Sequence, residues 1–202
     1  MLALHAHNGG LLHTADKKVE TMADMQGLRI RTPSPAVSDM LSFLGATPQG
    51  LPPGEVYENL QRGVIDGTVF PWDPMKSFGL IEVTNNHLDF GAYTVSFFFV
   101  MNEGTYNGLS PKAQACIDEH SGSALVEKFG GWWDDWDRPA REEAVAAGHT
   151  IVALTEEQRD EWRAALEPMI EAYLDKAEAD GIDNAREIYA RMQDKIAEYG
   201  GP

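Results

Sequence analysis

Residues 27–74 read GLRIRTPSPAVSDMLSFLGATPQGLPPGEVYENLQRGVIDGTVFPWDP, and this stretch decides the fold. Short apolar pieces such as Leu28–Thr32 and Val64–Phe70 have the composition of strands. Between them, start and stop signals predict one helix from Pro35 to Leu44 and another from Pro53 to Arg62, each followed by a glycine. Such alternation predicts an α/β layer with a largely parallel sheet.

One arginine in this stretch has an unusual position. Arg31 closes the strand-like piece and stands directly before Pro33 and a helix start. A guanidinium at such a turn can hold an anion with a planar, two-pronged set of donors. The chain has a formal net charge of −16, so an anion site in it needs a local cation. Arg31 is therefore a candidate anion-binding residue, with a surface or structural arginine as the alternative.

Composition narrows the class of protein. The chain has 202 residues, 43% of them apolar, and five tryptophans, which indicates a globular protein of one or two domains. The net charge of −16 makes nucleic acids and anionic membrane surfaces poor partners. No run of 18 apolar residues occurs, so we expect no direct insertion into a membrane.

Cysteine and histidine positions offer little for a metal or a catalytic site. A single cysteine, Cys116, excludes an internal disulfide, and its pairing with His120 on a helix is better explained as a small buried thiol. His5, His7 and His13 invite a zinc hypothesis, but no nearby acid or thiol completes a ligand set. We therefore predict no metal site, no cofactor and no catalytic residue.

The second half of the chain contains a strand without enough neighbours. Residues 94–102 are apolar on both faces, which predicts a buried central strand. A single helix is predicted over residues 111–147, with Pro139 as a possible kink, followed by a brief strand at 149–153. That brief strand alone cannot cover both edges of the apolar one, so the missing neighbours would come from sequence outside this chain.

With these segments laid out, the chain resembles the substrate-binding proteins of tripartite ATP-independent periplasmic (TRAP) transporters, the DctP-type family. No single short motif carries the resemblance. The matching pieces are GLRIRTP at 27–33, LGATP at 44–48, EVYENLQRGVIDG at 55–67, Pro71, MNEGTY at 101–106 and LSPKAQACI at 109–117.

The resemblance implies an α/β, periplasmic-binding-protein-like fold with two lobes (type II-like) and a long helix between them. Residues 1–96 would form the ligand-binding second lobe. Residues 97–155 would hold the return strand, the connecting helix and a remnant of the first lobe, and residues 156–202 would be helices packing on the lobes. Family members carry a signal peptide and most of the first lobe ahead of the position of His5, so we interpret the chain as a C-terminal fragment or a truncated gene product.

The implied function is a periplasmic solute-binding protein that captures a small organic carboxylate and delivers it to membrane permease subunits. Arg31 would form the salt bridge to the carboxylate. Phe70 stands where many members have an asparagine that meets the ligand, which favours an apolar or aromatic ligand body. Trp72, Ser34 and Tyr93 are the further candidate ligand-binding residues.

Each of these expectations has an alternative. Phe70 and Trp72 could pack in the core, and Ser34 could cap the helix that follows it. The Trp-rich run at residues 132–136 is interpreted as packing between lobes. An α/β enzyme acting on a small carboxylate is the second hypothesis for function, although no general base stands near Arg31 in sequence. A truncated fragment that binds nothing is the third.

Overall fold

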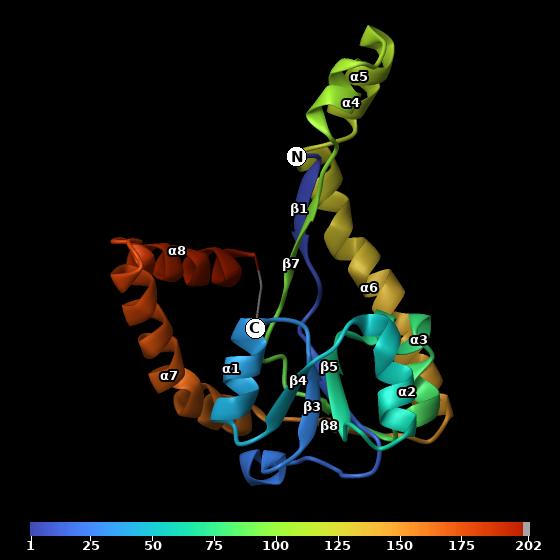
Figure 1. Ribbon diagram of the computed structural model, residues 1–202, viewed down its shortest axis with the longest axis vertical. Coiled ribbons are helices and arrows are strands. Elements are labelled where there is room, and N and C mark those ends of the chain that lie inside the picture. The colour runs from blue at the N-terminus through green and yellow to red at the C-terminus, as the bar shows by residue number, and fades with distance from the viewer. Residues whose placement is uncertain (200–202) are drawn as a thin grey trace. The chain divides into compact units, whose positions relative to one another are not determined.

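The strands of the 27–74 stretch belong to a six-stranded sheet. Figure 1 labels these strands, β3, β4 and β5, in the computed structural model. The structure describes residues 1–199, and the chain divides into two compact units, Met1–Thr155 and Glu156–Pro202. The sheet belongs to the first unit. Its strand order is β4 (Thr47–Gly50), β3 (Arg29–Thr32), β5 (Gly67–Phe70), β2 (Leu11–Thr14), β6 (Asn86–Asp89) and β8 (Thr150–Ala153).

Strand directions confirm most of the predicted parallel sheet. β3 runs parallel to both β4 and β5, and β6 runs parallel to β8. β2 lies between β5 and β6 and is antiparallel to both. The sequence does not predict β2, because its four residues LLHT are all buried and show no alternation of apolar and polar side chains.

Short helices connect the strands. Ser34 is the N-cap of the first α-helix, as the sequence predicts, and accepts a hydrogen bond from the Val37 N–H at 3.4 Å. The helix predicted from Pro53 to Arg62 begins as a 3-10 turn and continues as an α-helix. The connecting helices are η1 (Met22–Met25), α1 (Pro35–Phe43), η2 (Pro53–Glu55), α2 (Val56–Gln61), α3 (Trp72–Ser77) and η3 (Leu80–Val83).

A two-stranded ribbon stands apart from the large sheet in Figure 1. It consists of β1 (Ala3–Ala6) paired antiparallel with β7 (Ser96–Phe99). The prediction of a buried central strand at 94–102 is wrong for this chain, because Phe98 is 71% exposed and Phe99 is 53% exposed. β7 pairs with β1 alone among the described strands, so its apolar side chains have few neighbours to cover them.

The long helix predicted over residues 111–147 is divided. α4 (Glu103–Asn107) and α5 (Pro111–Glu119) precede α6 (Ser123–Ala146). The break falls at Gly122, whose φ of +63° a non-glycine residue rarely adopts, whereas Pro139 lies inside α6 without ending it. Ala140 and Ala144 of α6 join the core cluster that also contains Met75 and Leu80.

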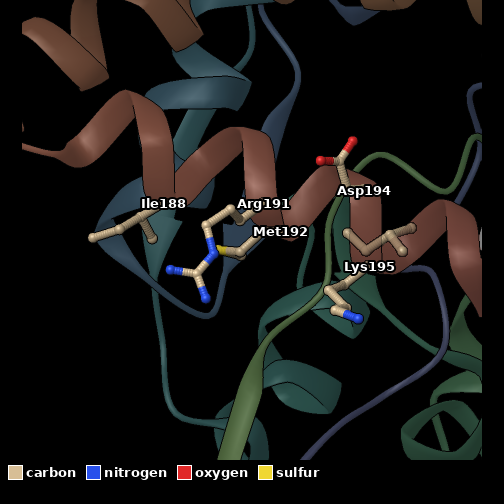
Figure 2. A pocket seen from close by; sticks show the side chains of 6 residues that line it. Ile188, Arg191, Met192, Asp194 and Lys195 are labelled. Atoms are coloured by element: carbon tan, nitrogen blue, oxygen red, sulfur yellow. The ribbon is translucent and has the colours of Figure 1, made fainter.

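The second unit is a pair of helices, α7 (Glu156–Ala179) and α8 (Ala185–Glu198). Arg186 of α8 forms ion pairs with Glu171, Asp175 and Glu178 of α7. One face of α8 is exposed and forms a shallow hollow of about 590 Å³, in which Figure 2 shows Ile188 and Met192 beside charged side chains.

Neither α7 nor any other helix in the described part of the chain combines the length and apolarity needed to cross a bilayer. The lobe assignments for residues 1–96, 97–155 and 156–202 stay a prediction.

Candidate functional site

Arg31 is a buried cation at the end of β3. Its side chain is 3% exposed, and among the described residues its guanidinium hydrogen-bonds only to backbone carbonyls: Nε donates to the Leu51 oxygen at 2.9 Å and Nη1 to the Val69 oxygen at 3.4 Å. Within residues 1–199 no carboxylate lies within ion-pair distance of it. Burial lowers the pKa of Arg31 to about 10, and the neighbouring Tyr93 phenol partly offsets that effect. The guanidinium is therefore charged at neutral pH and lacks a counter-ion.

The adjacent arginine provides an internal comparison. Arg29 lies two residues earlier on the same strand, and its guanidinium forms a two-pronged pair with Asp66, at 2.9 Å from Nε and 2.5 Å from Nη2. This pairing raises the pKa of Arg29 and lowers that of the Asp66 carboxyl. Arg29 thus has a structural role, and Arg31 is the arginine of this strand that remains available to an anion.

A pocket of about 620 Å³ opens beside Arg31. Its walls come from the end of β3, the first turns of α1 and residues 50–53. Ser34 lines the pocket while it also caps α1, so the N-terminal end of that helix faces the same space. A helix N-terminus and a buried guanidinium both favour a negatively charged ligand. Exposed Asp39 also lines the pocket and is the acidic group there.

Phe70 lies against Arg31 and Trp72 does not. The Phe70 ring centroid is 4.1 Å from Arg31 Cζ, a cation–π arrangement, and the side chain is 7% exposed. Trp72 is 5% exposed and packs edge-on against His13 and tilted against His87. Both aromatic residues therefore belong to the core, which was the alternative to a ligand-binding role. Phe70 also contacts Arg31.

Tyr93 completes the surroundings of Arg31. Burial raises the pKa of its phenol, and the charge of Arg31 acts in the opposite direction. The position depends on Gly10, because a Cβ at Gly10 would lie 2.0 Å from Tyr93 Cε1. The Gly10 N–H also donates to the Tyr93 carbonyl at 2.8 Å. The sequence identifies a glycine turn here, but not that the turn makes room for an aromatic ring.

Asp137 of α6 fixes the helix that follows Phe70. Its carboxylate accepts hydrogen bonds from the Asp73 N–H at 2.7 Å and from Asn8 Nδ2 at 3.0 Å. Burial raises the pKa of the Asp137 carboxyl. This acceptor satisfies the N-terminal end of α3, and nothing in the local sequence around Asp137 indicates it, because the partners are far away along the chain.

The histidines that suggested a metal site have other partners. Nδ1 of His5 accepts from Trp133 Nε1 at 3.1 Å, and Nε2 of His7 accepts from the Val95 N–H at 3.1 Å. His13 instead contacts His87, with 2.7 Å between their Nδ1 atoms. Within the described residues no three histidine, cysteine, aspartate or glutamate side chains are grouped so that they could hold a metal ion.

Comparison with known proteins assigns this chain to a family. A family model described as bacterial extracellular solute-binding protein, family 7, matches residues 1–177. The ectoine-binding periplasmic protein TeaA of Halomonas elongata is 29% identical over 201 residues, which cover 96% of this chain and 57% of the relative.

Solved structures agree with that match. A TRAP solute-binding protein from Rhodoferax ferrireducens, in complex with copurified benzoate, superposes with a TM-score of 0.91 at 32% identity, covering 98% of this chain and 63% of that one. A marine metagenome TRAP solute-binding protein specific for aromatic acid ligands, co-crystallised with 3-hydroxybenzoate, gives 0.91 at 37% identity with the same coverage. The predicted periplasmic-binding-protein-like α/β fold is confirmed, and the chain spans 57–63% of the length of these relatives.

Proposed function

The chain belongs to the bacterial extracellular solute-binding proteins of family 7, and on that premise we propose that it binds a small aromatic monocarboxylate at Arg31. Members of this family are binding proteins of TRAP transporters and not enzymes, which removes the enzyme hypothesis. The observation that carries the proposal is the buried Arg31 guanidinium, which has only backbone carbonyls as partners and borders a pocket.

A carboxylate supplies what this guanidinium lacks. Two carboxylate oxygens can accept from Nη2 of Arg31 and from the second hydrogen of its Nη1, because Nε already donates to the Leu51 carbonyl and Nη1 uses one hydrogen on Val69. A charged hydrogen bond contributes about 1.5–3 kcal/mol, and a two-pronged pair more. The Ser34 hydroxyl hydrogen, which the helix cap does not use, can donate to the same ligand.

The body of the ligand would be apolar. Phe70 offers an aromatic ring at the guanidinium, and Pro33, Pro35, Pro52 and Pro53 contribute apolar walls to the pocket. The relatives solved with benzoate and with 3-hydroxybenzoate bind acids of this kind. Trp72 and Tyr93 would have an indirect role. Trp72 packs against His13, and Tyr93 lies near Arg31. We further propose that the loaded protein works outside the cytoplasm and delivers the acid to the permease of a TRAP transporter.

Calorimetric titration with benzoate tests the assignment of Arg31. Arg31→Lys keeps the charge but cannot present a planar fork, so we expect affinity to fall at least tenfold, about 1.4 kcal/mol. Arg62→Lys is the matched control, since Arg62 pairs with Glu58 on the surface. Equal affinity in the Arg31→Lys and unmodified proteins would contradict the role of Arg31. A chain that binds no aromatic acid at all would support the hypothesis of a non-binding fragment.

A further inference from the structure

A row of polar side chains crosses the six-stranded sheet from the proposed carboxylate site. Arg31 pairs with Thr68, Thr68 with His13, and His13 with His87, each in register on neighbouring strands. Cross-strand partners share one face, and strands lie about 4.8 Å apart, so the row is continuous. Thr68 and His13 are 0% exposed and His87 is 1% exposed, which places an ionisable row inside the core.

Hydrogen bonds fix the direction of the histidine part of this row. His13 Nε2 lies 3.1 Å from the Phe70 carbonyl, which can only accept, so Nε2 carries the hydrogen and Nδ1 accepts. His87 Nδ1 therefore donates to His13 Nδ1 at 2.7 Å, and His87 Nε2 accepts from His149 Nδ1 at 3.0 Å. One carbonyl thus sets the tautomers of three rings, and the Nε2 atom of half-buried His149 is left as the free acceptor.

This arrangement can take up one proton without moving a ring. A proton that binds His149 Nε2 allows the Nδ1 hydrogen of His149 to pass to His87 Nε2. The Nδ1 hydrogen of His87 can then pass to His13 Nδ1, which leaves His149 and His87 neutral and His13 an imidazolium. The bond from His13 Nε2 to the Phe70 carbonyl is kept throughout, so the positive charge moves two strands closer to Arg31.

The charges around the row determine how favourably the histidine chain holds this proton. Arg31 on β3 is the nearest cation along the row, and Tyr93 acts on Arg31. Next to Trp72, which covers His13 and His87, α3 carries Asp73 and Lys76, and α6 carries the buried Asp137 and the Glu143 that pairs with Lys76. Burial and the neighbouring ring keep the pKa of His87 at about 4 and that of His13 well below its usual range, so the empty site disfavours the proton.

An anion at Arg31 would change this balance, because it cancels the positive charge that opposes a second cation in the row. The Thr68 hydroxyl oxygen lies between Arg31 and His13 in the register and has no hydrogen-bond partner among the described residues, so it can reorient toward either charge. We propose that carboxylate binding at Arg31 is coupled to uptake of a proton by the chain His13–His87–His149. This inference rests on the proposed function of Arg31.

Titration calorimetry with benzoate in two buffers of different ionisation enthalpy measures the coupling directly. At pH 5, nearer the pKa of about 4 that burial gives His87, we expect the unmodified protein to take up a fraction of a proton per benzoate, and at pH 8 none, because the chain is then neutral with or without ligand. The full coupling should be about two- to fivefold in affinity, the size of a charge interaction over roughly two strand spacings, and less than about twofold of it should appear between pH 8 and pH 5. Benzoate stays mostly ionised at pH 5.

His149→Gln removes the proton entry beside β8, four strands along the sheet from β3, and His120→Gln at the C-cap of α5 is the matched control, since His120 lies outside the row. We expect proton uptake to vanish only in His149→Gln. Uptake that is equal in both variants, with binding still abolished by Arg31→Gln, would overturn the coupling and leave the proposed function intact. Absence of benzoate binding would overturn both. Nitrogen-15 spectra of the ligand-free protein should show His87 protonated at Nδ1; an Nε2-protonated His87 would also overturn the coupling.

Discussion

Arg29 and Arg31 are two residues apart on β3 and therefore lie on the same face of the strand, yet each meets a different environment. Arg29 remains half-exposed and paired with Asp66, whereas Arg31 is buried and meets only carbonyl oxygens. An uncompensated buried charge is costly, so such a residue is retained where a partner arrives from outside. At this scale the strand-to-helix position of Arg31 is visible in the sequence, but its lack of a carboxylate partner depends on side chains from distant segments.

Phe70 provides a prediction at the residue scale. Phe70→Leu removes the ring that lies 4.1 Å from Arg31 Cζ while it keeps an apolar side chain. We expect benzoate to bind about two- to thirtyfold more weakly, and cyclohexanecarboxylate to lose less, because only the aromatic ligand loses a ring contact. Phe78→Leu is the control, since Phe78 lies against Phe70 at 6.4 Å and is 42% exposed. An equal loss for both acids in competition titrations would contradict a stacking role of Phe70.

At the scale of elements, strand β2 is the one that places an ionisable side chain in the middle of the sheet. It brings His13 between Thr68 and His87, and it is antiparallel to both neighbouring strands. Sequence patterns predict the other five strands of the sheet, because each is apolar or flanked by turn signals. They do not predict the strand order 4-3-5-2-6-8, since the order follows from pairings between distant segments. The histidine chain is hidden from sequence reasoning for the same reason.

The buried histidines make stability depend on pH. The pKa of His87 is lowered to about 4, and that of His13 is also lowered, whereas in the unfolded chain both stay near 6.5. Below pH 6.5 the unfolded state binds more protons, so stability is present above this pH and is lost as the pH falls toward 4. His87 alone accounts for up to about 3 kcal/mol over that window.

Urea denaturation at pH 7.5, 6 and 5 checks this dependence. Between pH 6.5 and 5, we expect the free energy of unfolding to decrease less in His87→Leu than in the unmodified protein. This difference should hold whatever the effect of the substitution on stability at pH 7.5. His120→Gln serves as control, because His120 is exposed and its ring contacts only its own helix. The same slope in His87→Leu and in the unmodified protein would refute the contribution of this buried ring.

The ribbon β1–β7 is the feature that matters most for the molecule as a whole. Its strands pair with each other and α6 passes beside β1, yet Phe97, Phe98 and Phe99 remain 39–71% exposed. The sequence correctly indicates that this apolar strand lacks neighbours, but it cannot show that the strand would stay exposed instead of joining the large sheet. This chain covers 63% of the length of the TRAP solute-binding protein solved with benzoate.

This exposed surface predicts self-association of the chain. A run such as SFFF with high β-propensity, no charge and open edges is a template for further strands. Phe98→Lys should raise the concentration at which the protein stays monomeric, measured by light scattering, with an unchanged midpoint of thermal unfolding, because Phe98 is 71% exposed. Tyr173→Lys on α7 is the control, at 56% exposure. Equal scattering from both variants would show that association does not proceed through the ribbon.

The unpaired guanidinium of Arg31 has a consequence for the lifetime of the protein in a cell. A ligand that binds only the folded state stabilises it by about 2.7 kcal/mol at a concentration one hundred times its Kd. Proteases that cut the unfolded chain would therefore spare the occupied protein and remove the empty one. Under the proposed function, the abundance of this protein would rise and fall with the supply of the aromatic acid, without any change in its synthesis.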